Sequence, residues 1–274
     1  MLAFTFGVFG LIIGSFLNVL VLRWGEKGLG GRSACVSCAR QLRWYEMVPV
    51  LSWIVLRGKC RTCKARISIQ YPLVEAITGI VFALIGSASL PVSTLYLLLF
   101  CLIAAVLIAV AVYDLYHTII PDIWVYLFAV LAFISQALLT PGGGFGVLLF
   151  LAGPIAALPL FLLWAVSRGA WMGFGDVKLA LGIGWLLGPF YGIAAIFFGF
   201  VIGAVVSVGV LLPLPHIAKA LSRIGITVLA PRPGGFTMKS EIPFGPFLVA
   251  STFIIWLLLI HNIDPLALVG LSLS

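Results

Sequence analysis

Charged residues are scarce in this 274-residue chain: Asp, Glu, Lys and Arg together make up 9% of it, whereas 63% of its residues are hydrophobic. The mean hydropathy is +1.24. Because an ordinary soluble domain carries about 25% charged residues, this composition excludes water as the main solvent of the protein. We therefore expect a chain that crosses a lipid bilayer several times.

Long hydrophobic runs take the place of the missing charge. A transmembrane helix needs about 20 mostly apolar residues, and eight stretches approach that length. We predict an all-α polytopic membrane protein with about eight transmembrane helices, in which the division between the sixth and seventh falls near Gly188-Pro189. The stretches are residues 2–22, 72–88, 93–113, 123–139, 146–166, 177–190, 191–213 and 244–261.

Lys and Arg are absent from the predicted connections near 89–92, 140–145 and 263–274. If the N-terminus lies outside the cell, all 16 basic residues fall on the opposite side of the membrane. Since positively charged loops remain in the cytoplasm, we predict this orientation and an even number of spans. The net charge of +8 then reflects basic loops near anionic lipid rather than nucleic-acid binding.

One cytoplasmic segment is much longer than a connecting loop. We divide the chain into a first transmembrane helix, a cytoplasmic insertion and a transmembrane core of about seven helices, at residues 1–22, 23–71 and 72–274. Within the insertion, residues 47–56 are apolar but too short to span a bilayer, so we interpret them as an interfacial or packed segment. A later proline-rich loop, 214–243, contains at most a short amphipathic helix at 217–224. No repeat of 20 to 50 residues is visible.

Cysteine is rare as well, and four of the five cysteines form two CxxC pairs, Cys35 with Cys38 and Cys60 with Cys63. The 21 residues between the pairs are typical of a four-thiolate zinc site. Both pairs lie in the predicted cytoplasmic insertion, where structural disulfides are rare. We predict structural zinc, with thiol redox chemistry as the alternative, and interpret Cys101 as a small core residue of its apolar span.

Only eight residues are acidic, and three aspartates cluster at the predicted cytoplasmic edge. Asp114 ends the third span, Asp122 opens the fourth, and Asp176 follows three residues that include two glycines. Two adjacent carboxyl groups do not ionise together easily. The ionised one can take a proton from water as it attacks a peptide carbonyl, while the protonated one donates a hydrogen bond to the carbonyl oxygen.

This pattern predicts an aspartic peptidase, but the spacing alone does not bring Asp114 to Asp176. Asp122 and Asp176 each begin a helix, where a carboxylate also serves as a cap or is stabilised by the helix dipole. We interpret His117 as an interfacial residue. Ionisable groups at membrane depth are costly and usually functional, which keeps the catalytic interpretation of the aspartates open beside the structural one.

The chain resembles the bacterial type IV prepilin peptidases, also called prepilin leader peptidase/N-methyltransferases. The resemblance rests on six motifs that follow one another over nearly the whole chain. They are Gly14-Ser15-Phe16-Leu17-Asn18-Val19, the two CxxC pairs, Tyr71-Pro72-Leu73-Val74-Glu75, Asp114 through Asp122, Gly173-Phe174-Gly175-Asp176-Val177-Lys178, and Ile242-Pro243-Phe244-Gly245-Pro246-Phe247.

The resemblance implies a bacterial inner-membrane enzyme with Asp114 and Asp176 as catalytic residues at the cytoplasmic edge. It implies cleavage after a glycine, which removes a basic leader from type IV pilus prepilins or type II secretion pseudopilins within the same membrane. Many members also methylate the new N-terminus with S-adenosylmethionine, a cofactor for which the chain has no soluble-type glycine fingerprint. Glu75 is the candidate for that methyl transfer, with a structural ion pair as the alternative.

Glu46, Glu75 and Glu241 are further candidates for docking a basic leader or for pairing with Lys and Arg. A presenilin-like intramembrane protease shares a GxGD motif, but the cysteine-bearing insertion and the motif at residues 242–247 argue against it. An ion-coupled transporter or a zinc-stabilised scaffold is the alternative from another class. A transporter predicts ionisable groups near mid-bilayer and an inverted repeat, whereas the aspartates lie at one edge.

Overall fold

The computed structural model describes residues 1–25, 30–89, 92–139, 146–211 and 243–270. These residues form helices and loops without a β-strand, and two isolated bridges lie in the loops. The long helices are α1 (Leu2–Arg23), α3 (Gln70–Gly86), α4 (Thr94–His117), α5 (Asp122–Leu139), α6 (Val147–Ser167), α7 (Phe174–Leu187), α8 (Pro189–Val206) and α10 (Gly245–Ile260). The short ones are η1 (Trp44–Glu46), α2 (Leu51–Val55), η2 (Ser207–Leu211) and η3 (Ala267–Val269).

Each of the eight predicted apolar stretches forms one of the long helices. Five described helices, α1, α4, α5, α6 and α8 with its continuation, are long and apolar enough to cross a membrane, and α3 and α10 are shorter apolar helices. The prediction of an all-α polytopic membrane protein is therefore confirmed, whereas the number of crossings stays a prediction. The predicted division near Gly188 is also present: its φ is +82°, and Pro189 begins α8.

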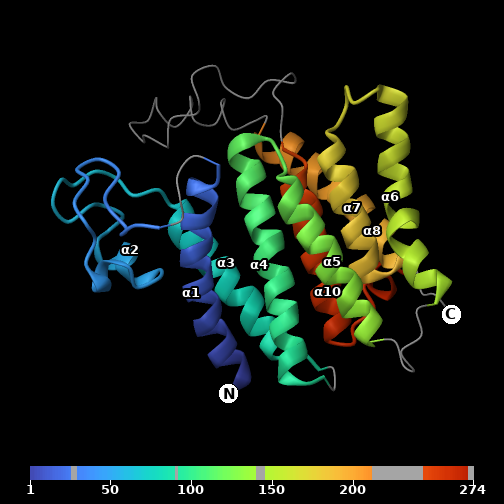
Figure 1. Ribbon diagram of the computed structural model, residues 1–274, viewed down its shortest axis with the longest axis horizontal. Helices are drawn as coiled ribbons and strands as arrows, with labels where there is room; N and C mark the ends of the chain where they lie inside the picture. The colour runs from blue at the N-terminus through green and yellow to red at the C-terminus, as the bar shows by residue number, and fades with distance from the viewer. Residues whose placement is uncertain (26–29, 90–91, 140–145, 212–242, 271–274) are drawn as a thin grey trace.

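The helices form one bundle (Figure 1), and α4 is the most deeply buried of the five helices that are long enough to cross a membrane. Ile103, Leu107 and Val110 of α4 are fully buried, as apolar residues are when neighbouring helices surround a span. Helices α1 and α3 pack together on one side of α4, whereas α5 and α10 pack against its other side, and α7 packs against α5. This arrangement leaves the carboxyl end of α4 between elements from both halves of the bundle.

Glycine permits a close contact between helices α1 and α3. A Cβ atom on Gly10 would lie 2.6 Å from the carbonyl oxygen of Thr78, and one on Gly14 would lie 2.7 Å from Cα of Glu75. Small residues at such contacts allow helices to approach within a membrane. The glycine-containing motif of the first span therefore sets how close α3 and its Glu75 come to α1.

The segment between α1 and α3 contains the cysteine loops, η1 and α2, and it lies beside α1 at one edge of the bundle (Figure 1). The apolar residues 47–56 contribute the five-residue helix α2, as a segment too short to span would. The amphipathic helix predicted at 217–224 lies outside the described residues, as does Glu241.

Candidate active site and metal site

Three helix ends from distant parts of the sequence meet at one edge of the bundle. Asp114 lies in the last turn of α4, Asp176 in the first turn of α7, and Gly245 begins α10. The two aspartates are 4% and 7% exposed, respectively. The structure therefore places both predicted catalytic carboxyl groups inside the protein, each at the end of a helix that continues into the bundle.

Gly245 brings the start of α10 against Asp114. Its backbone N–H donates a hydrogen bond to Oδ2 of Asp114 over 3.1 Å. A Cβ atom at position 245 would lie 2.6 Å from that same oxygen, a distance that real Cβ atoms do not tolerate. Glycine at the first residue of α10 is thus required for this hydrogen bond. In the sequence, Gly245 is one residue of the motif at 242–247, and that pattern predicts no role for it.

The side chain of Ile120 lies between the first turn of α7 and the start of α10. It would lie 3.1 Å from a Cβ atom on Gly175 and 3.3 Å from one on Gly245. One residue of the α4–α5 connection therefore fills the space between the first turns of α7 and α10. Gly175, which precedes Asp176, and Gly245, which donates to Asp114, therefore lie against the same side chain. The structure brings together the two aspartates that the spacing alone could not.

Neither carboxyl group is neutralised by a cation: among the residues that the structure describes, no Lys or Arg forms an ion pair with Asp114 or Asp176. Two buried carboxyl groups without a counter-ion share protons, because both cannot carry charge at short range. The arrangement can therefore supply a proton acceptor and a proton donor to the same bound peptide. The N-cap of α7 is Gly173, so the alternative in which Asp176 caps this helix receives no support.

Asp122 has different surroundings. It begins α5, its side chain is 59% exposed, and its Oδ1 accepts a hydrogen bond from Nζ of Lys178 over 2.7 Å. His117 is likewise exposed, and its ring stacks on that of Tyr113. The structure thus separates Asp122, a surface ion-pair partner, from the buried pair of aspartates.

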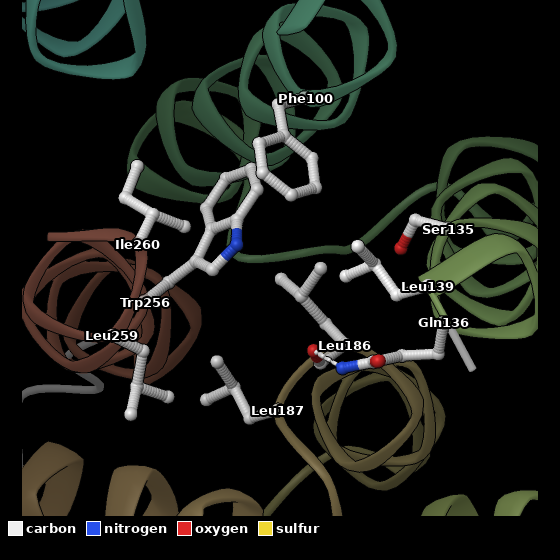
Figure 2. Close-up of a pocket in the computed structure, with 9 residues that line it drawn as sticks. All are labelled: Phe100, Ser135, Gln136, Leu139, Leu186, Leu187, Trp256, Leu259 and Ile260. Atoms are coloured by element: carbon white, nitrogen blue, oxygen red, sulfur yellow. Dashed lines mark hydrogen bonds between the residues drawn. The ribbon is translucent and has the colours of Figure 1, made fainter. Parts of the chain in front are cut away.

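The cavity in Figure 2 lies at the other end of the bundle. It has a volume of about 100 Å³ and is lined mainly by apolar residues together with Ser135 and Gln136, whose Nε2 donates to the carbonyl oxygen of Leu186 over 2.6 Å. Phe100, which also lines it, precedes Asp114 by 14 residues of α4, or about 21 Å of helix. This cavity is too far from the aspartates to hold the reacting peptide bond.

The four cysteines of the two CxxC pairs come together in the segment beside α1. Their sulfur atoms all lie within 4.8 Å of one another, and those of Cys35 and Cys63 are 3.8 Å apart. Tetrahedral zinc with four thiolates at about 2.3 Å requires sulfurs about 3.8 Å apart. The cluster could therefore hold a metal ion of that kind. Cys101 is buried in α4, as expected for a core residue.

The two cysteine loops have the same backbone design, offset by 25 residues. The N–H of Cys35 donates to the oxygen of Arg40, and the N–H of Cys60 donates to that of Ala65. An isolated antiparallel bridge closes each loop, and a residue with positive φ follows the second cysteine of each. The sequence analysis found no repeat because, within these loops, only the cysteines are obviously alike, whereas the repetition lies in the backbone hydrogen bonds.

This backbone also prepares the first sulfur of each loop for a metal. The N–H groups of Cys63 and Thr62 lower the pKa of the Cys60 thiol to about 6. The N–H groups of Cys38 and Ser37 similarly lower the pKa of the Cys35 thiol. Because the thiolate is the form that binds metal, these hydrogen bonds favour coordination.

Two of the three candidate glutamates lie in the described residues. Glu46 forms an ion pair with Arg40 over 2.6 Å, the pairing that the sequence predicted as one alternative. Glu75 is 7% exposed, and its Oε2 accepts a hydrogen bond from the backbone N–H of Val50 over 2.7 Å. Among the described residues Glu75 has no ion pair with Lys or Arg. The contact of Glu75 is thus a hydrogen bond between α3 and the cysteine-bearing segment.

Comparisons with known proteins agree with this organisation. The model of the bacterial Peptidase A24 N-terminal domain matches residues 8–89, and that of the type IV leader peptidase family matches residues 101–208. The "Type 4 prepilin-like proteins leader peptide-processing enzyme" of Escherichia coli O78:H11 is 33% identical over 266 residues, which cover 87% of each chain. A "Prepilin leader peptidase/N-methyltransferase" of Bacillus subtilis is 32% identical over 262 residues, 91% of this chain and 92% of that protein.

A protein of the same name from Myxococcus xanthus is 48% identical over 77 residues, 27% of this chain and 23% of that protein. No solved structure matches the chain significantly. The two family models cover both the cysteine-bearing segment and the two aspartates, and the Escherichia coli and Bacillus subtilis relatives align over most of their own length. On these matches, the chain belongs to the type IV leader peptidase family.

Proposed function

We propose that this protein is a membrane aspartic endopeptidase that removes the basic leader from type IV prepilins or pseudopilins, with Asp114 and Asp176 as its catalytic residues. The observation that carries the proposal is the pair of buried carboxyl groups where the ends of α4, α7 and α10 meet, neither of which forms an ion pair with a Lys or Arg in the described part of the chain. Family membership supplies the class of substrate.

In the proposed reaction, one aspartate is ionised and takes a proton from the water that attacks the carbonyl carbon of the scissile bond. The other is protonated and donates a hydrogen bond to the carbonyl oxygen, then passes its proton to the departing amine. The Gly245 N–H holds Asp114 in place for both steps. The pair titrates as a unit, so neither role is assigned to one residue.

The proposed location is the bacterial inner membrane, with the N-terminus outside and the aspartates at the cytoplasmic edge. The distribution of Lys and Arg supports this orientation. It also suits a substrate whose apolar segment lies in the bilayer while its leader stays in the cytoplasm. In that orientation the cleaved bond lies where the chain leaves the membrane.

We further propose that the four cysteines hold structural zinc and that the enzyme methylates the new N-terminus with S-adenosylmethionine. The sulfur separations support zinc, whose four protein ligands would leave it no catalytic position. The name of the Bacillus subtilis and Myxococcus xanthus relatives, which includes N-methyltransferase, supports methylation. We assign no residue to the binding of S-adenosylmethionine and derive no step through it.

The decisive experiment is a cleavage assay on purified protein in detergent with a prepilin substrate, with and without S-adenosylmethionine, followed by mass spectrometry of the mature N-terminus. We expect Asp114→Asn and Asp176→Asn each to lower the cleavage rate by about 10²-fold to 10⁴-fold, the range for losing a positioned acid or base. A methyl mass should appear on the product only when the cofactor is present.

Asp264→Asn is the matched control, because it removes one carboxylate from the region that follows α10, at the opposite end of that helix from Gly245. It should cleave at the normal rate. Zinc content and thermal unfolding of each variant show whether the protein has folded. Normal cleavage by a folded Asp114→Asn or Asp176→Asn protein would contradict the proposed dyad.

A further inference from the structure

The net positive charge of this protein comes from one segment. Residues 23–71 contain ten basic and two acidic residues, a net charge of +8, which is the net charge of the whole chain. The remaining six basic and six acidic residues cancel. A segment that holds all of the net charge repels other cations and attracts an anionic partner.

The same segment exposes a cluster of large apolar side chains on α2. Leu51, Ile54 and Val55 are 61%, 56% and 79% exposed. Their spacing of three and four residues places them on one face of this short helix. Trp53 points the other way, since its Nε1 donates to the carbonyl oxygen of Ile67 over 3.2 Å. Trp53 therefore packs within the segment. The opposite face of α2, formed by Leu51, Ile54 and Val55, is apolar and exposed.

Aromatic and basic groups lie next to this face. Helix α2 packs against η1, where Trp44 is 76% exposed. The hydroxyl of the adjacent Tyr45 accepts hydrogen bonds from Arg43 over 3.2 Å and from Arg61 over 2.8 Å. Exposed Trp beside aliphatic residues and arginines is the composition of segments that rest at a membrane surface.

The fold also sets the level of this surface relative to the membrane helices. The hydrogen bond from Val50 to Glu75 ties the residue before α2 to the first turns of α3. Val50 has the unfavourable φ of +60°, which a branched side chain rarely adopts, so this contact holds a defined geometry. Figure 1 shows α2 beside α1, below the level at which α1 ends. Helix α2 thus lies alongside a membrane-span candidate and not beyond its end.

We propose that α2 and Trp44 form a lipid-docking surface, with Trp44, Leu51, Ile54 and Val55 inserted among the acyl chains and the surrounding arginines on anionic headgroups. This proposal depends on the proposed function in one respect: the proposed orientation of the protein assigns the surface to the cytoplasmic leaflet. A basic substrate leader does not fit a segment of net charge +8, whereas anionic phospholipid does. The docked segment keeps the cysteine loops against the bundle and clear of the aspartates.

Photo-cross-linking tests this surface directly. The full-length protein carries p-benzoylphenylalanine in place of Val55, or in place of Val36 as the matched control, because Val36 is a valine of the first cysteine loop that is even more exposed, at 96%. Each protein is placed in nanodiscs of phosphatidylcholine alone or with phosphatidylglycerol, irradiated, and analysed for lipid adducts by mass spectrometry. Zinc content shows that the segment is folded.

We expect several-fold more lipid adduct at position 55 than at position 36, and a further increase with phosphatidylglycerol that high salt removes. Adding Leu51→Ser and Ile54→Ser should lower the adduct at position 55 while zinc content is unchanged. Equal lipid adducts at the two positions, or adducts at position 55 to protein only, would overturn the proposal. Lipid cross-linking does not depend on cleavage. Repeating it with Asp114→Asn therefore tests the lipid-docking surface even if the proposed peptidase function is wrong.

Discussion

The two aspartates and the four cysteines are held in place by different means. Asp114 and Asp176 lie on helices that run through the bundle, and their surroundings are fixed by close packing at Gly175 and Gly245. The cysteines lie on loops whose order comes from backbone hydrogen bonds and clustered thiols. A site made of helix ends inherits the rigidity of the bundle, whereas a site made of loops needs a bound metal to become rigid.

The two regions also differ in net charge. The segment with the cysteines holds the entire net charge of +8, and the remainder of the chain is neutral overall. Low net charge suits a region inside lipid, where each unpaired charge is costly. The two buried carboxyl groups at the edge of the bundle, which have no ion pair among the described residues, are therefore the exception that requires a functional explanation, whereas the basic segment beside α1 is explained by the membrane surface.

The largest effect in the cysteine-bearing segment is expected from losing its metal. Changing Cys35 and Cys38 to Ser should abolish zinc binding and unfold the segment, because structural zinc contributes about 10–16 kcal/mol in small zinc domains. Zinc content by atomic emission and limited proteolysis of residues 30–69 measure this. Cys101→Ala is the control, since Cys101 lies in α4. Unchanged metal content in the double variant would defeat the zinc assignment.

The same experiment tests whether the two regions are independent. If the bundle alone holds the aspartates, the double cysteine variant retains helical content and a measurable rate of prepilin cleavage. If helical content and cleavage were lost together with zinc, the two regions would not be independent, and the metal would support the bundle as well.

The packing of the active-site edge is tested by adding one methyl group. Gly245→Ala places Cβ 2.6 Å from Oδ2 of Asp114, so the carboxyl group or the start of α10 must move. A displacement of about 1 Å costs about 10²-fold in rate, and overpacking costs about 1–3 kcal/mol of stability. Cleavage kinetics and thermal unfolding measure the two effects.

Gly146→Ala is the control, because nothing lies within 4 Å of the added methyl group. A normal rate in Gly245→Ala would mean that the hydrogen bond from Gly245 to Asp114 has no part in the reaction.

A smaller effect is expected where the two regions are joined, at Glu75. Glu75→Ala leaves the part-buried Val50 N–H without its acceptor, which costs about 1–3 kcal/mol, whereas Glu75→Gln keeps an oxygen there. These two variants also distinguish a structural role of Glu75, as the acceptor for Val50, from a role in methyl transfer. If Glu75 only holds Val50, the Gln variant retains both methylation and the order of the cysteine segment.

Loss of methylation in Glu75→Gln, with cleavage and zinc content unchanged, would instead assign the carboxylate a role in methyl transfer. Mass spectrometry of the mature N-terminus and proteolysis of the cysteine segment separate these outcomes. Glu46→Gln is the control, since it removes a glutamate that pairs with Arg40 within the segment itself.

The helices of this fold could be predicted from the sequence because each apolar run is bounded by loop residues and has the length of a helix. The CxxC spacing likewise predicted the cysteine cluster. The meeting of Asp114 with Asp176 could not be predicted, because 62 positions separate them and no local pattern encodes helix packing. The contacts of Gly245 and Glu75 were missed for a related reason: each uses a backbone N–H, which has the same chemistry at nearly every position.

The smallest effect is expected at Asp122, the aspartate nearest in sequence to the proposed dyad that remains outside it. Its exposed pair with Lys178 should contribute only about 0.2–1 kcal/mol. Asp122→Asn should therefore cleave prepilin at a rate close to normal, and Asp122→Asn with Lys178→Gln should be no worse than the single variants combined. A rate loss comparable with that of Asp114→Asn would place Asp122 in the catalytic machinery, because an exposed ion pair cannot account for so large an effect.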